Sequence, residues 1–245
     1  MKNWLICIDD TDDIGTKGTG EIAEEIALLL ANISGGKASF VTRHQLFVHP
    51  DIPYTSHNSA MCFALRSPLT RAEIHQYAVA HLIAESAPKA DPGLAILDLG
   101  SQYDATALMD FGRRAKSEVI TKLAAHELAE QLNIQLTEHG GTGQGVIGAL
   151  AGLGLRLMGS DGRVKGQIKL GQFEDVALEL SVADILEQTG LDAVMSTEQH
   201  LLAADDRVLL KGKVKAVYLG HQFVLLVDRE AQTWRNAGKR ALQAY

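Results

Sequence analysis

The first 33 residues constrain the fold most, because a buried strand, an acidic loop and an amphipathic helix follow one another there. The apolar run NWLICID (3–9) is short and rich in β-forming residues, so it predicts a buried strand. The segment EIAEEIALLLANI (21–33) places its apolar residues on one helical face. The loop between them therefore lies where the carboxyl end of a strand meets the N-terminus of a helix.

This loop carries four carboxylates, Asp9, Asp10, Asp12 and Asp13, followed by the glycine- and threonine-rich run GTKGTG (15–20). Clustered carboxylates need a positive partner, and Mg²⁺ is bound by carboxylate and water oxygens. The backbone amides at a helix N-terminus bind the anionic end of a phosphate. The loop therefore predicts a metal-assisted phosphate site. The alternative is a solvated acidic loop whose aspartates cap the following turn.

Two residues of this loop have competing interpretations. Thr19 is placed either to cap the helix N-terminus or to accept a phosphoryl group. Asp10 follows a first strand, as does the nucleophile of the haloacid dehalogenases, whose motif is Asp-x-Asp-x-Thr/Val. The chain has Ile14 at the last position of that motif. A phosphatase with Asp10 as its nucleophile is therefore the weaker alternative.

The rest of the chain mixes strands with helices and predicts an α+β or mixed α/β fold. The predicted strands are 39–48, 59–66, 93–99, 134–139 and 163–170, and the predicted helices are 69–86, a stretch at 106–132 broken or bent at Gly112, and a small-residue helix within 140–162. From about residue 171 the sequence predicts a helix at 181–190, a hairpin within 207–228 that turns at 219–221, and a closing helix at 229–245.

A second glycine loop begins at residue 140, and GTGQGVIGALAGLG (141–154) contains Gly143-x-Gly145-x-x-Gly148. This spacing matches the dinucleotide-binding fingerprint, and no Lys-Ser/Thr follows it as in a Walker A loop. Close packing of a small-residue helix explains the later glycines. Gly141, Gly143 and Gly145 are explained less well by packing, and their backbone amides form a candidate second anion loop.

Net charge and cysteine content exclude several functions. The chain has 23 Lys and Arg against 30 Asp and Glu, which gives a net charge of −7. An acidic surface repels phosphate backbones and argues against non-specific nucleic-acid binding. Two cysteines cannot build a disulfide framework or a cysteine-rich zinc module. The start MKNWLICIDD resembles neither a signal peptide nor a membrane span, so we expect a cytoplasmic protein.

Three segments together resemble the archaeal isoleucine-tRNA agmatinylcytidine synthetases. CIDDTDD (7–13) is similar to the family's GIDDTDS, HPDIPYTSHNSA (49–60) to its NPNIPYKTRGNA, and GQGVIGALAGLG (143–154) to its G-x-G-(L/V)-(I/V)-G-A-L-A-A-I-G. DPGLAIL (91–97) fits the family's intervening NPG segment. The resemblance covers residues 1 to about 170.

The resemblance implies an ATP-dependent enzyme with a kinase-like domain beside a ferredoxin-like domain. We accordingly expect a kinase-like region at 1–132, and a ferredoxin-like region with a C-terminal hairpin and helix at 133–245. The family's magnesium ligands fall on Asp9, Asp10 and Asp12, and its phosphate-accepting threonine falls on Thr19. In the family, a cytidine of the anticodon is phosphorylated and then displaced by agmatine.

The chain departs from the family at several contact positions. The family's lysine and arginine fall on Thr55 and His57, and its asparagine falls on Ser59, with Asn58 adjacent. We expect no counterpart of the family's oligonucleotide-binding fold and zinc ribbon, since two cysteines cannot build the ribbon. Together with the acidic charge, this argues against a tRNA substrate and favours a small-molecule acceptor or one presented by another protein.

The leading hypothesis is a Mg²⁺- and ATP-dependent phosphotransferase or synthetase with Asp10 and Thr19 as catalytic residues. The residues expected to contact nucleotide or substrate are Gly18, Thr19, Gly20, Arg43, His57, Asn58, Gly141, Gly143 and Gly145. The alternative is a nucleotide-binding regulatory module without catalysis. The region from 171 onward is expected to cover the site, form a homodimer or bind the specific substrate.

Overall fold

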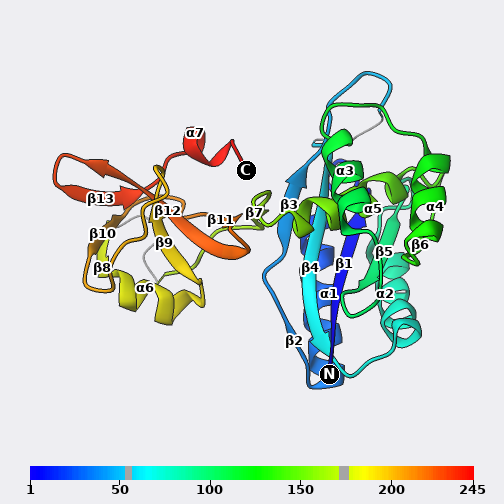
Figure 1. The fold of residues 1–245 in the computed structure, drawn as a ribbon, viewed down its shortest axis with the longest axis horizontal. Coiled ribbons are helices and arrows are strands. Elements are labelled where there is room, and N and C mark those ends of the chain that lie inside the picture. Colours follow the sequence, from blue (N-terminus) through cyan, green and yellow to red (C-terminus); the bar gives the residue numbers. More distant parts are fainter. Residues whose placement is uncertain (53–56, 171–176) are drawn as a thin grey trace. The chain divides into compact units, whose positions relative to one another are not determined.

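The computed structural model describes residues 1–52, 57–170 and 177–245, which form two compact units, 1–158 and 159–245. Thr55 lies outside the described residues. The mixed α+β class predicted from the sequence is confirmed in both units (Figure 1).

The first unit contains a mainly buried sheet in the order β6–β5–β1–β4–β3, with β2 also pairing β4. Its strands are β1 (Lys2–Asp9), β2 (Lys37–Ala38), β3 (Thr42–Gln45), β4 (Ser59–Ser67), β5 (Gly93–Asp98) and β6 (Gln135–Glu138). All neighbouring strands are antiparallel. The predicted strands at 3–9, 59–66, 93–99 and 134–139 are confirmed, whereas the predicted strand at 39–48 is reduced to β3, and β2 precedes it.

Side chains of β1 alternate between two cores, one on each face of the sheet. Ile6 and Ile8 pack with α1 (Thr19–Ser34) and α2 (Arg71–Glu85), while Leu5 and Cys7 pack with α3 (Ala105–Arg114), α4 (Lys122–Gln131) and α5 (Gly145–Leu157). The first unit is therefore a sheet covered by helices on both faces (Figure 1).

Helix α5 determines where the first unit ends. It packs against β1, β4 and β5 and carries Gly152, where a Cβ would collide with the sulfur of Cys7. The boundary between the two compact units therefore follows Met158. The assignment of a kinase-like region to 1–132 and a ferredoxin-like region to 133–245 stays a prediction. Gly112 lies inside α3, so the expected break there is wrong. A Cβ at Gly112 would lie 2.9 Å from the carbonyl oxygen of Ala151, which shows that this glycine allows α3 and α5 to approach.

The second unit is a sheet in the order β7–β11–β12–β13–β10–β8, with β9 pairing β12. Its elements are β7 (Arg163–Val164), β8 (Leu178–Ser181), α6 (Val182–Thr189), β9 (Ala193–Ser196), β10 (Arg207–Leu210), β11 (Ala216–Leu219), β12 (Gln222–Glu230), β13 (Thr233–Asn236) and α7 (Lys239–Leu242). The predicted turn at 219–221 is confirmed between β11 and β12, where Gly220 and His221 have positive φ.

Two predictions for the second unit are wrong. The closing helix at 229–245 is replaced by the end of β12, by β13 and by the four-residue α7, because β13 pairs with both β12 and β10. The predicted strand at 163–170 is reduced to Arg163–Val164. No helix in the described part of the chain is long and apolar enough to cross a membrane.

Candidate nucleotide site

The acidic loop leaves the carboxyl end of β1 and lies beside the start of two helices. Asp9 is the last residue of β1, and α1 begins ten positions later at Thr19. The first turns of α5 lie against Asp9, since a Cβ at Gly148 would collide with its carboxylate and a Cβ at Gly145 would lie 3.0 Å from its carbonyl oxygen. The sheet and both helices therefore fix the start of the loop.

Asp9 is a buried carboxyl group with little compensation for its charge. Its residue is 8% exposed, and its carboxylate accepts a hydrogen bond of 2.9 Å from the amide of Asp10. Burial, and then the neighbouring Asp10 and Asp12 carboxylates, raise the pKa of Asp9 to about 8 despite that hydrogen bond. Asp9 thus holds a proton at neutral pH unless a cation lies beside it.

Asp10 has a strained backbone and a second acidic neighbour. Its φ of 54° lies in the left-handed region, which non-glycine residues adopt at an energetic cost. Burial, and then Asp91 and Asp12, raise the pKa of Asp10 to about 6. Asp91 therefore belongs to the acidic cluster, although it is not among the site residues predicted from the sequence. Its only sequence signal was the Asp-Pro-Gly turn directly before β5.

Thr19 is the first residue of α1, and its hydroxyl faces the acidic loop. Its Oγ1 donates to Oδ1 of Asp12 at 3.1 Å, and the residue is 6% exposed. The helix N-cap is Gly18, with no side-chain capping bond, so the N-cap interpretation of Thr19 is wrong. A carboxylate that accepts the proton of a hydroxyl is the arrangement that activates a nucleophile.

Asp13 has a purely local role in the described structure. Its carboxylate accepts from the amide of Ile14 at 2.7 Å, and its carbonyl accepts from the hydroxyl of Thr16 at 2.9 Å. Asp13 thus closes the turn after the aspartates, as the solvated-loop alternative predicted for this residue.

The acidic residues could hold a cation without forming a complete metal cage. Among the described residues, no group of three or more His, Cys, Asp or Glu side chains is arranged to hold a metal ion. Mg²⁺ is commonly held by one or two carboxylates together with water and substrate phosphates. Asp9 is buried beside other carboxylates, so a cation at this position would compensate its negative charge. The assignment of Asp9, Asp10 and Asp12 as ligands of that ion stays a prediction.

Strand register places Arg43 on the α1 face of the sheet. Ile8 of β1 lies opposite Met61, and Met61 lies opposite Arg43. Arg43 Nε donates to the hydroxyl of Ser59 at 3.0 Å, and its Nη2 donates to Gln45 at 3.3 Å. Ser59 and Gln45 form the next cross-strand pair on this face, at the level of the residues that follow Ile8. The guanidinium group therefore lies toward the end of β1 that leads into the acidic loop. Its phosphate contact stays a prediction.

The structure gives the Asn58 side chain a local partner. Asn58 Nδ2 donates to the backbone carbonyl of Phe47 at 2.6 Å, and the backbone carbonyl of Asn58 accepts from the side-chain amide of Gln45 at 2.7 Å. His57 is exposed and adjoins the undescribed stretch 53–56. Contacts of His57 and Asn58 with a ligand stay predictions.

The second glycine loop packs against two carboxylates. A Cβ at Gly141 would collide with Asp91, and one at Gly143 would collide with Glu138. The amide of Thr142 donates to the Asp91 carboxylate at 2.7 Å, and the amide of Gly145 donates to its carbonyl at 3.1 Å. These contacts explain the glycines by close approach, and an anion-binding role for Gly141, Gly143 and Gly145 stays a prediction.

Gly148→Ala is expected to destabilise the protein by about 2 kcal/mol, since the added methyl group displaces the Asp9 carboxyl group in a packed interior. Chemical denaturation would measure this loss. The double variant Gly148→Ala with Asp9→Ala should recover part of it, because the two sites are in contact. Gly238→Ala, at an open position with negative φ, serves as the control. Additive effects of the two changes would contradict the described contact.

Comparisons with known proteins support the fold. No family model and no curated protein matches the chain. Among solved structures, the chain is similar to TiaS in complex with tRNA and ATP, with a TM-score of 0.56 and 24% identity over 74% of this chain and 39% of that chain. It is also similar to a tRNA fluorescent labeling enzyme, with a TM-score of 0.55 and 25% identity over 74% of this chain and 38% of that chain. Apo TiaS, described as a tRNA agmatidine synthetase, is similar with a TM-score of 0.54 and 24% identity over 74% of this chain and 38% of that chain.

These likenesses show a shared fold and confirm the resemblance inferred from the three sequence motifs. The chain spans about two fifths of the length of the solved proteins that it matches.

Proposed function

We propose that this chain is a Mg²⁺- and ATP-dependent phosphotransferase or synthetase-like enzyme. The observation that carries the proposal is the hydrogen bond from the Thr19 hydroxyl to the Asp12 carboxylate at the N-terminus of α1. The buried Asp9 and strained Asp10 lie in the same loop. A solved structure with a similar fold is a complex with ATP, which supports the choice of nucleotide.

The chemistry follows from the positions of these residues. Asp12 accepts the hydroxyl proton of Thr19 while Oγ1 of Thr19 forms a bond to the terminal phosphorus of ATP. The bond between that phosphorus and the bridging oxygen breaks, and ADP leaves. Mg²⁺ held by Asp9, Asp10 and Asp12 would neutralise charge on the phosphates. The amides at the start of α1 and Arg43 would bind phosphate oxygens. The phosphoryl group then passes to an acceptor.

The test is calorimetry of ATP binding with and without Mg²⁺, followed by peptide mass spectrometry of the incubated chain. We expect Mg²⁺-dependent heat and phosphate on Thr19, with the phosphate absent in Asp10→Asn. Heat without phosphate would favour the regulatory nucleotide-binding module. Release of phosphate from a simple phosphate ester without ATP would favour the Asp10 phosphatase.

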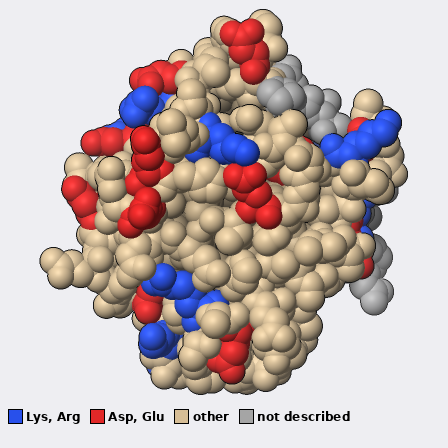
Figure 2. All heavy atoms as spheres, turned by 90° about the vertical axis from the view of Figure 1, so that its right-hand side faces the viewer, with Lys and Arg blue, Asp and Glu red and all other residues tan. Residues whose placement is uncertain are grey.

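The acceptor we propose is a small molecule, and an amine is the first to test because one solved relative is a complex with agmatine. The net charge of −7 supports a small acceptor over tRNA. The face drawn in Figure 2 carries Asp and Glu interspersed with Lys and Arg. A cytoplasmic location and a homodimer stay predictions.

One observation favours a nucleic-acid acceptor as the second candidate. Segments 162–170, 208–227 and 231–245 together contain nine Lys or Arg and no Asp or Glu. The amide of Ile168 donates to the carbonyl of Val214 at 2.9 Å, and Asn236 and Lys211 exchange two hydrogen bonds, so the segments adjoin. Transfer of phosphate to tRNA rather than to an amine would select this candidate.

A further inference from the structure

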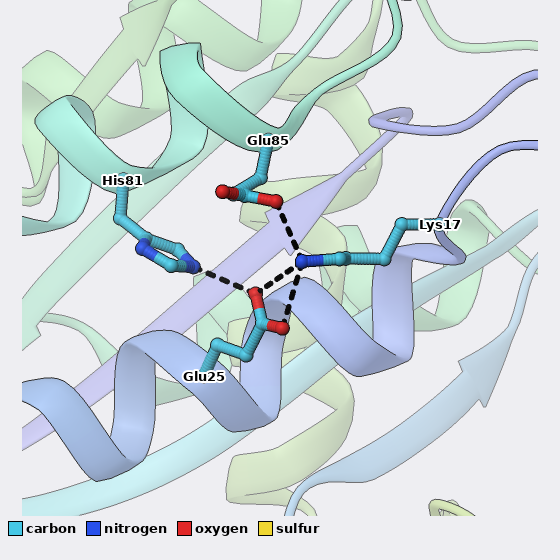
Figure 3. Close-up of polar contacts among 4 residues, drawn as sticks. All are labelled: Lys17, Glu25, His81 and Glu85. Carbon is cyan, nitrogen blue, oxygen red and sulfur yellow. Dashed lines mark hydrogen bonds and ion pairs between the residues drawn. The ribbon is translucent and has the colours of Figure 1, made fainter.

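Lys17 lies between the aspartates and α1, yet its ammonium group contacts two glutamates (Figure 3). Its Nζ donates to both carboxylate oxygens of Glu25 on α1, at 2.8 and 3.0 Å, and to Glu85 at the end of α2, at 2.5 Å. His81, one turn before Glu85, lies 2.8 Å from the same Glu25 carboxylate. We call Lys17, Glu25, His81 and Glu85 the loop clasp.

The loop clasp connects the acidic loop to the end of α2, and a backbone hydrogen bond makes a second connection there. This bond of 2.9 Å runs from the amide of Ala87 to the carbonyl of Thr11. Thr11 precedes Asp12 in the chain, and Lys17 follows it. The stretch that contains Asp12 is therefore fixed on both sides to the same end of one helix.

The ammonium group of Lys17 compensates the negative charge of the two glutamates in the loop clasp. Its side chain is 28% exposed, and those of Glu25 and Glu85 are 33% and 34% exposed. Hydrogen bonding from Lys17, and then from His81, lowers the pKa of Glu25, while the two glutamates raise the pKa of Lys17. Without the ammonium group, two carboxylates would face each other beside a loop that already holds four.

We propose that Lys17 is a positioning residue for the phosphoryl-transfer site, an inference that rests on the proposed function. It acts through Glu25 and Glu85 and does not contact the phosphates. By fixing the loop to α1 and α2, it keeps the Asp12 carboxylate at the distance where it accepts the Thr19 hydroxyl. Small displacements of a reacting group reduce rates strongly, so loss of this anchor is expected to slow the reaction.

The experiment compares Lys17→Met with Lys2→Met in two measurements. Lys2 pairs with Asp98 at the other end of β1, so its variant removes a lysine ion pair away from the acidic loop. In Lys17→Met, amide hydrogen exchange of residues 10–18 without nucleotide should accelerate about tenfold, and phosphorylation of Thr19 should slow at least about tenfold. Lys2→Met should change neither. Lys17→Arg, which can still bond both glutamates, should restore much of the rate.

The outcomes separate this inference from the proposed function. If the natural protein does not phosphorylate Thr19, the proposed function fails. Amide hydrogen exchange of residues 10–18 then still shows whether the loop clasp anchors the loop. Unchanged exchange in folded Lys17→Met overturns the anchor. Faster exchange with an undiminished phosphorylation rate overturns the positioning role. If Lys17→Met does not fold, Glu85→Gln, which weakens one acceptor, should show smaller changes in both measurements, and no change there overturns the proposal.

Discussion

Thr19→Ala is expected to abolish ATP-dependent phosphorylation of this chain while leaving it folded. The substitution removes the only hydroxyl group of that side chain and its hydrogen bond to Asp12, a loss of about 1 kcal/mol in stability. The carboxylates of the acidic loop and the amides of α1 remain, so ATP binding measured by calorimetry should change little. Peptide mass spectrometry after incubation with Mg²⁺ and ATP would measure the phosphate.

Two neighbouring substitutions make the result specific to the Thr19 hydroxyl. Thr19→Ser keeps an oxygen at the same position and should retain part of the reaction. Thr16→Ala removes a hydroxyl that only closes the turn at Asp13, and it should leave phosphorylation of Thr19 in place. Full phosphorylation of Thr19→Ala would show that Thr19 is not the acceptor, and the proposed step through Asp12 would then be wrong.

Much of the first unit could be predicted because its elements are determined by local patterns. The apolar run of β1 is buried on both faces, so a continuous hydrophobic segment sufficed to locate it. Helix α2 begins at a capping box formed by Thr70 and Glu73, a signal that depends on a few adjacent residues. The acidic loop was likewise placed correctly between β1 and α1, because both neighbours were recognisable.

The features that could not be predicted depend on contacts between distant residues. Asp91 joins the acidic cluster only because the turn before β5 lies beside the end of β1. Helix α5 packs on the first sheet through contacts with β1, β4 and β5, which lie far from it in the sequence. In the C-terminal unit, pairing of β13 with two strands overrides the helical preference of residues such as Ala231 and Gln232.

Asp9 is expected to make the metal-free protein less stable as the pH rises from about 4 to about 8. Its pKa is about 8 in the folded chain, against an ordinary value of 3.8. In this interval the unfolded chain has lost the proton and the folded chain retains it, so the free energy of unfolding falls with pH. Each pKa unit corresponds to about 1.4 kcal/mol, which gives a loss on the order of 4 kcal/mol by pH 7. Asp10 contributes in the same direction, since its folded pKa is about 6.

Urea denaturation at several pH values, with Mg²⁺ and with a chelator, would measure this dependence. Asp9→Asn should remove most of the decrease, because an amide group carries no charge to bury, whereas the exposed Asp205→Asn should not. If Asp9 is a ligand, Mg²⁺ should stabilise the natural protein most at high pH, where cation binding replaces the retained proton. The same substitution should weaken Mg²⁺-dependent ATP binding, so a gain in stability would accompany a loss of function. Stability independent of pH in the natural protein would show that Asp9 is not held as a buried acid, and the electrostatic reason for a cation at this loop would disappear.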